Sequence, residues 1–127
     1  IKQEGTDLTI VTWGLMVHES IKAAKELKDY SIEIIDIRTI IPLDKETIFN
    51  SVKKTGKVLI VHEDTLTAGF GAEIAALISD NCFQYLDGPV KRLAGHDTHI
   101  PYHPNLENFV LPTKEKIKNA IKELIEF

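Results

Sequence analysis

Two glycines, Gly69 and Gly71 in the stretch TAGFGAEIAA, are the first residues whose type and spacing suggest chemistry. Glycines two apart between a strand and a helix are typical of the turn that holds a dinucleotide pyrophosphate. Here, however, the preceding apolar run KVLIVHE ends near His62, and the residues in between include Glu63 and Asp64, which would repel a phosphate. We therefore interpret the glycines as points of close backbone packing. A stand-alone nucleotide-binding module is kept as an alternative.

Three histidines, His96, His99 and His103, form a second candidate group in the stretch HDTHIPYH. Neutral imidazoles are good zinc ligands, but the spacing matches no strong zinc signature. Pro101 within this stretch and Pro104 directly after it predict an extended loop rather than one helix face. We therefore predict no metal site here.

The remaining candidates are interpreted as structural residues. Cys82 ends an apolar helix face, where a small buried core residue is more common than a reactive thiolate. His18 and His62 are interpreted as histidines with satisfied hydrogen bonds at helix or strand ends. We predict no catalytic, cofactor-binding or metal-binding residue in this chain from residue chemistry.

The elements that must position these residues alternate between strand and helix. Apolar, β-branched runs predict strands near residues 7–14, 31–40, 57–63 and 89–95. Apolar spacing and capping residues predict helices near residues 17–29, 44–55, 71–82 and from 113 onward. Because the strands are apolar on both faces, we expect an α/β fold in which helices cover both sides of a mainly parallel sheet. Residues 1–6 are predicted to be the end of a linker and residues 7–127 one domain.

Composition narrows the classes of partner. The 127 residues carry a net charge of −4 with scattered basic residues, which argues against a nucleic-acid partner. No apolar run approaches the roughly 20 residues that span a bilayer, so we expect no membrane contact. A single cysteine fits a cytosolic setting. The chain begins at Ile1 rather than Met, and we expect it to be part of a longer polypeptide.

Several motifs together resemble one family. TIVTWGLMVHESIKAA, IEIIDIRTIIPLD, VLIVHEDTLTAGFGAEIAA, GPVKRLAGHDTHIPYHPNLE and LPTKEKI occur in this order between about Asp7 and Phe127. They closely resemble the C-terminal domain of the beta subunit of thiamine-diphosphate-dependent 2-oxo acid dehydrogenases. These are the decarboxylating components of the pyruvate, branched-chain and acetoin dehydrogenase systems. The chain more distantly resembles the C-terminal domain of transketolase, so a transketolase-type enzyme is a further alternative.

The resemblance implies a three-layer α/β fold with a five-stranded, mostly parallel sheet that includes one antiparallel strand. The extra extended structure is expected near Cys82 to Asp87. The resemblance also implies that thiamine diphosphate and Mg²⁺ are bound in the full-length enzyme and not by this part of it. We therefore expect the chain alone to be inactive.

The same resemblance implies partners and a cellular location. The partners are an alpha subunit or alpha half, a second beta subunit, and the peripheral subunit-binding domain of a dihydrolipoyl acyltransferase. Asp87, before GPV, and the C-terminal carboxylate of Phe127 are expected to receive basic side chains of the acyltransferase, with a plain turn role as the alternative for Asp87. His99 and His103 depart from the family pattern in their loop. The location implied is the bacterial cytoplasm, which we favour, or the mitochondrial matrix.

Overall fold

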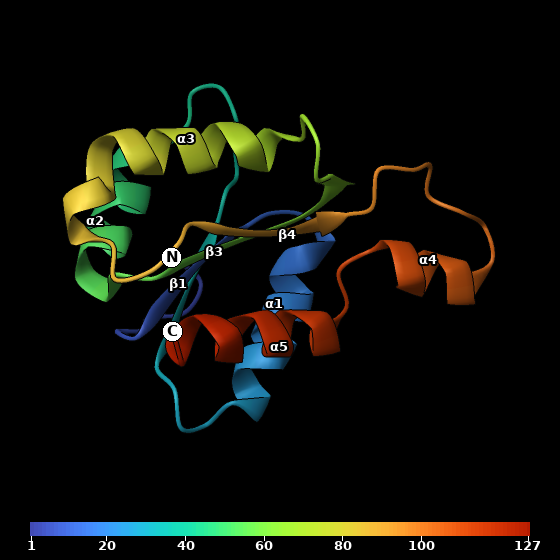
Figure 1. The fold of residues 1–127 in the computed structure, drawn as a ribbon, viewed down its shortest axis with the longest axis horizontal. Helices are drawn as coiled ribbons and strands as arrows, with labels where there is room; N and C mark the ends of the chain where they lie inside the picture. Colours follow the sequence, from blue (N-terminus) through green and yellow to red (C-terminus); the bar gives the residue numbers. More distant parts are fainter.

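Four parallel strands form one sheet with the spatial order β2-β1-β3-β4 (Figure 1). The computed structural model describes all 127 residues. Its elements are β1 (Leu8–Thr12), α1 (Leu15–Glu26), β2 (Ile32–Asp36), α2 (Lys45–Thr55), β3 (Val58–Thr65), α3 (Phe70–Cys82), the 3₁₀ turn η1 (Phe83–Tyr85), β4 (Lys91–Gly95), α4 (Pro104–Val110) and α5 (Lys114–Ile125).

The sheet is buried on both faces, which makes three layers. One core cluster joins the strands to α1 and α5 through residues such as Ile10 and Ile121, and the other joins them to α2 and α3 through Val11 and Ile78. Successive residues of a strand point to opposite faces, so a strand covered on both sides must be apolar throughout. The predicted parallel sheet with helices on both faces is confirmed.

Local signals define the ends of two of the predicted helices. Asp44 caps α2 by accepting a hydrogen bond from the Thr47 amide at 3.0 Å, and α2 ends at Gly56 with a left-handed φ of 71°. Thr113 caps α5 by accepting from the Lys116 amide at 3.4 Å. No helix is both long and apolar enough to cross a bilayer.

The sheet has four strands, so the prediction of a fifth, antiparallel strand is wrong. Near Cys82 to Asp87 the chain continues from α3 into η1 instead of extending, and the η1 side chains are not buried. Antiparallel pairing is limited to one isolated bridge between Gln3 and Ile34. Residues 1–6, predicted as the end of a linker, include this bridge and lie along β2.

Helix α4 is an element that the sequence analysis missed. It begins at Pro104, which is tolerated in the first turn because its missing N–H would have no partner there. The His103 Nδ1 accepts a hydrogen bond from the Asn105 amide at 3.3 Å. Together with the loop before it, α4 forms an arm, residues 96–110, that extends away from the sheet (Figure 1).

Candidate functional site

Asp87 and Phe127, the two predicted partner-binding residues, lie at one corner of the fold. Gly88 connects them, since a Cβ placed on it would lie 3.3 Å from the Phe127 ring. The Asp87 amide donates to the Gly56 carbonyl at 2.8 Å, which attaches this turn to the end of α2. Both side chains are exposed, and 75% of Phe127 is accessible. Residues that are 40 positions apart in sequence thus present one surface, which we call the docking corner.

The surroundings of the docking corner are apolar and aromatic. A shallow hollow beside it is lined by Phe83, Pro89 and Val90 as well as by Asp87 and Phe127. Phe83 is 78% exposed. The Asp87 carboxylate lies so close to the Gly56 Cα that any Cβ at position 56 would overlap it. An exposed carboxylate beside accessible aromatic rings suits a partner that carries basic and apolar side chains.

A second group lies at the carboxyl ends of the central strands. The chain leaves β1 toward β2 on one side and β3 toward β4 on the other, so β1 and β3 flank the point where the strand order reverses. Open α/β sheets bind ligands outside this point. Here the Trp13 ring stacks on the His62 ring with centroids 5.1 Å apart and planes 9° apart, and Phe70 meets Trp13 edge-on at 5.9 Å. Aromatic side chains therefore pack together at this point.

His62 is fully buried, and neither of its ring nitrogens has a hydrogen-bond partner. Burial lowers the pKa of His62, while Asp64 opposes that shift and Arg92 adds to it. The interpretation of His62 as a histidine with satisfied hydrogen bonds is therefore wrong. The neutral ring is held by packing, because a charged imidazolium without a partner is costly to bury.

The two glycines of TAGFGAEIAA pack against His62. A Cβ on Gly71 would overlap the His62 Nε2, and a Cβ on Gly69 would overlap the Thr65 carbonyl and lie 2.8 Å from the His62 Cε1. Ala68, between them and the strand, adopts a left-handed φ of 60°. The prediction of close backbone packing at Gly69 and Gly71 is confirmed.

The three histidines of the HDTHIPYH stretch do not converge. His96 packs on Phe109 with ring centroids 5.0 Å apart, and His103 caps α4. Between them, the Asp97 carboxylate accepts hydrogen bonds from the amide and hydroxyl of Thr67, the latter at 2.5 Å. No group of three or more His, Cys, Asp or Glu side chains is arranged to hold a metal ion.

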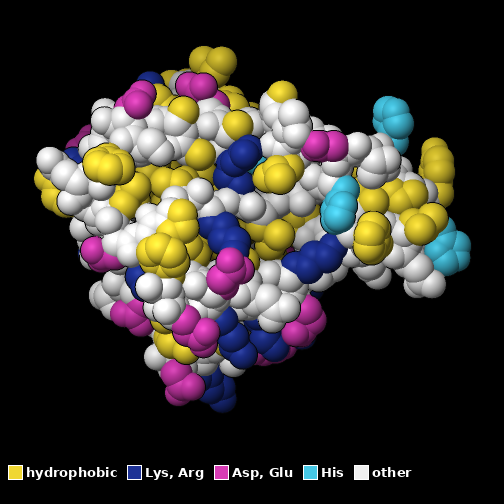
Figure 2. Space-filling model, viewed as in Figure 1, with side chains coloured by type: hydrophobic (Ala, Val, Ile, Leu, Met, Phe, Trp, Pro, Cys, Tyr) yellow, Lys and Arg dark blue, Asp and Glu magenta, His cyan; other side chains and the backbone are white.

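The arm presents an apolar surface that sequence reasoning missed. Ile100, Tyr102, Leu106 and Phe109 are all exposed. Figure 2 shows hydrophobic and histidine side chains gathered over this projecting part of the molecule. Lys116 anchors the arm to α5, because its ammonium donates to the Phe109 carbonyl at 2.6 Å and the Leu111 carbonyl at 2.8 Å. A contiguous exposed apolar patch is typical of an interaction surface.

Comparison with known sequences agrees with this fold. The family model for the transketolase C-terminal domain matches residues 1–117. The 2-oxoisovalerate dehydrogenase subunit beta of Bacillus subtilis is 46% identical over 130 residues, covering 100% of this chain and 40% of that protein. A pyruvate dehydrogenase E1 component subunit beta of Staphylococcus aureus is 46% identical, covering 100% of this chain and 39% of that protein. The chain thus spans about 40% of the length of the curated relatives it matches.

Comparison with solved structures shows the same architecture. An inactive beta4 tetramer of a split-gene transketolase superposes with a TM-score of 0.84 at 25% identity, covering 98% of this chain and 41% of that chain. A 2-oxoglutarate:ferredoxin oxidoreductase from Magnetococcus marinus shares the fold at a TM-score of 0.62 and 16% identity, covering 98% of this chain and 18% of that chain. The resemblance stated from the motifs is confirmed. This chain belongs to the transketolase C-terminal domain family.

Proposed function

We propose that this chain is the subunit-assembly and acyltransferase-docking domain of the beta subunit of a 2-oxo acid dehydrogenase decarboxylating component. The observation that carries the proposal is 46% identity, over the whole chain, to beta subunits of 2-oxoisovalerate and pyruvate dehydrogenases. The full-length enzyme would oxidatively decarboxylate a 2-oxo acid and acylate lipoamide. It would act in the bacterial cytoplasm or, less favoured, in the mitochondrial matrix.

Thiamine diphosphate and Mg²⁺ belong to the full-length enzyme in this proposal. The turn after β3 is where an α/β sheet of this kind would hold a diphosphate, but its residues do not fit one. His62 fills the space under Gly71, and the acidic Glu63 and Asp64 border the same turn. We therefore assign no cofactor contact to this chain.

The docking corner is proposed to bind the peripheral subunit-binding domain of a dihydrolipoyl acyltransferase. Asp87 would receive a basic side chain, and the exposed rings of Phe83 and Phe127 would supply apolar contact. Such an arrangement places charge for orientation beside aromatic side chains for affinity.

The arm is proposed to bind the other subunits of the enzyme, namely an alpha subunit or alpha half and a second beta subunit. Its exposed Ile100, Tyr102 and Phe109 are the kind of side chain that a permanent subunit interface buries. The homo-tetrameric state named for the split-gene transketolase relative is consistent with such a role.

The test is activity of the chain alone and of the assembled enzyme. The full-length beta subunit combined with its alpha partner, thiamine diphosphate and Mg²⁺ is expected to decarboxylate a 2-oxo acid, and residues 1–127 alone are expected not to. Decarboxylation by residues 1–127 alone would contradict the assignment. Saturable binding of NAD or ATP to the chain in calorimetry would instead support the nucleotide-binding alternative. Turnover of sugar phosphates by the full-length protein would support the transketolase alternative.

A further inference from the structure

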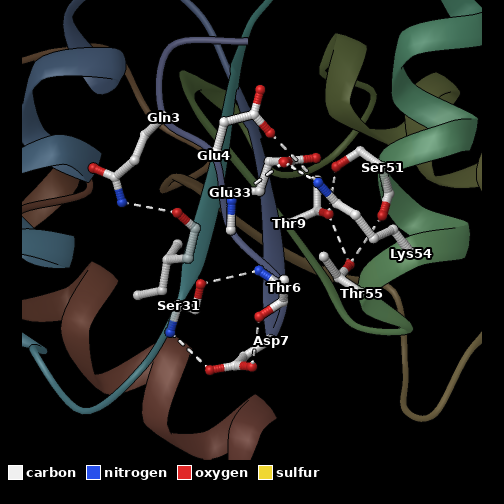
Figure 3. A network of polar contacts seen from close by, with 12 residues as sticks. Gln3, Glu4, Thr6, Asp7, Thr9, Ser31, Glu33, Ser51, Lys54 and Thr55 are labelled. Carbon is white, nitrogen blue, oxygen red and sulfur yellow. Dashed lines mark hydrogen bonds and ion pairs between the residues drawn. The ribbon is translucent and has the colours of Figure 1, made fainter.

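A fully buried carboxylate, that of Glu33, lies near the start of the edge strand β2. The Glu33 side chain has no accessible surface, and its Oε2 pairs with the Lys54 ammonium from α2 (Figure 3). The Gly5 amide donates to the same oxygen at 3.3 Å, and the Glu4 carboxylate lies 3.6 Å from the Lys54 Nζ. Glu33 therefore joins three separate parts of the chain: β2, α2 and the incoming segment of residues 2–5.

The electrostatics of this contact favour the charged pair. Burial raises the pKa of Glu33, but the hydrogen bonds from Lys54 and Gly5 help to outweigh it, and that pKa lies below its ordinary value. The hydrogen bond to Glu33 in turn raises the pKa of Lys54. Both groups therefore remain charged at neutral pH.

The incoming segment is held against β2 by its backbone as well. The Lys2 amide donates to the Ile34 carbonyl at 2.8 Å, and the Ile34 amide donates to the Gln3 carbonyl at 2.9 Å. The Gln3 side-chain amide donates to the Ile32 carbonyl at 2.8 Å. Residues 2 and 3 thus satisfy polar groups on the open edge of β2, which would otherwise offer a template for pairing with another chain.

Gly5 packs so closely on β2 that no residue with a side chain fits at this position without a shift. A Cβ at position 5 would overlap the backbone of Ile32 and Glu33. On the α2 side, the Thr9 hydroxyl bonds to the hydroxyls of Ser51 and Thr55, each at 2.7 Å, which extends the polar layer between the sheet and α2 (Figure 3).

The geometry points to a clasp in which the Glu33–Lys54 pair holds residues 2–5 on the edge of β2. On the proposed function, this clasp fixes the place and direction at which the upstream part of the beta subunit joins the domain. Backbone hydrogen bonds hold the chain at residues 2–3, on Ile34, and at residues 6–7, on Ser31, and the Gly5 amide between them bonds to the Glu33 side chain. Separating the two partners would leave the fully buried Glu33 carboxylate without its counter-ion, which is costly, and this suits a positioning role.

Hydrogen exchange of the full-length beta subunit in the assembled enzyme tests the clasp. Glu33→Gln and Lys54→Met should each speed amide exchange in residues 2–5 and at Ile34 by roughly tenfold or more. Both variants remove the ion pair between β2 and α2, and Lys54→Met also leaves the buried Glu33 carboxylate without its counter-ion. Exchange in β3 should change much less. Glu19→Gln is the matched control, because it removes an exposed pair with Lys22 and should leave residues 2–5 unchanged.

Unchanged exchange in residues 2–5 of both variants would overturn the clasp, and so would an equal rise throughout the domain. If a single variant fails to fold, the double variant Glu33→Gln/Lys54→Met leaves no unpaired charge and gives the same comparison. This readout needs neither catalysis nor acyltransferase binding. The decarboxylation assay tests the proposed function separately, so a failure of that proposal is distinguished from a failure of the clasp.

Discussion

The Trp13 ring stacks on the His62 ring with a centroid separation of 5.1 Å and an interplanar angle of 9°. This contact joins the residue that follows β1 to the middle of β3, and these two strands flank the point where the strand order reverses. The first turn of α3 closes over it, since Gly71 packs directly on the imidazole. Trp13 is the only tryptophan of the chain, so its fluorescence reports on this contact and on the Phe70 ring that meets it edge-on.

The stability of the domain should fall as the pH drops below the ordinary histidine pKa of about 6.5. Burial lowers the pKa of His62 in the folded chain, so the unfolded chain binds the proton first. The contribution of neutral His62 is therefore complete above pH 6.5 and is lost as the pH falls toward the lower folded pKa. Denaturant unfolding followed by Trp13 fluorescence between pH 8 and pH 5 measures the effect.

His62→Gln should flatten this pH dependence, while His18→Gln, which alters an exposed histidine, should leave it intact. If His62→Gln retains the full pH dependence, then titration of another group is responsible.

Gly71→Ala should destabilise the domain by about 1–3 kcal/mol, which is typical of overpacking. The added methyl would overlap the His62 Nε2, and Trp13 stacks against that same ring. Gly88→Ala is the matched control, because its Cβ would lie 3.3 Å from the exposed Phe127 ring, which is free to shift. Equal unfolding free energies for Gly71→Ala and the unmodified chain would show that α3 does not pack on His62 in this way.

Glu26 should make α1–α5 packing sensitive to acid. Its carboxylate accepts hydrogen bonds from Lys114 and Lys118, each at 2.6 Å, and these lower the pKa of Glu26 to about 2. The folded pKa lies below the unfolded value, so this contribution is present above about pH 4.5 and is lost as the pH falls toward 2. Glu26→Gln should lower the thermal midpoint slightly at pH 7 and not at pH 2. An equal decrease at both pH values would rule out the ion pairs as the cause.

Shortening the exposed side chains of the arm should weaken subunit assembly without unfolding the domain. Tyr102→Ser and Ile100→Ser, at two exposed positions, are expected to raise the dissociation constant of the assembled enzyme by roughly tenfold in sedimentation measurements. Phe83→Ser removes an exposed ring from the docking corner and should leave assembly unchanged. Assembly that is unaffected by both arm variants would remove the arm from the proposed interface.

The layers and most helix ends could be predicted from the sequence because their causes are local. Asp44 and Gly56 bound α2 through a side-chain cap and a left-handed turn, and both signals lie within a few residues of the helix they define. Strands that are apolar on both faces likewise require helices on both faces of the sheet. The close packing at Gly71 could be predicted because the nearby acidic residues Glu63 and Asp64 argue against a phosphate site, which leaves packing as the role of the glycine.

Other features depend on contacts between distant residues, which spacing does not reveal. Glu33 lies in an apolar strand, and only the folded chain places Lys54 and Gly5 beside it. His62 has no signal in the sequence that distinguishes a stacked, unpartnered ring from a hydrogen-bonded one. Helix α4 was missed because Pro101 and Pro104 indicated a loop, although Pro104 suits a first turn.

Asp87 and Phe127 were named from the resemblance, and the structure brings them to one corner through Gly88. Phe127→Ala in the assembled enzyme should weaken binding of the peripheral subunit-binding domain by removing exposed apolar contact, and this effect should persist at high salt. Surface plasmon resonance on the assembled enzyme measures it. A loss that disappears at high salt would indicate that the ring itself contributes nothing.

The most direct test of the account is calorimetric titration of the assembled enzyme with the peripheral subunit-binding domain of its acyltransferase. Asp87→Lys should reduce the affinity by roughly tenfold at low salt, and the difference should shrink at high salt, because an exposed charge acts through a screened interaction. Glu46→Lys, a charge reversal at the opposite end of α2, should bind like the unmodified enzyme. Equal affinity of the Asp87→Lys and unmodified enzymes at low salt would contradict the assignment of this corner as the docking site.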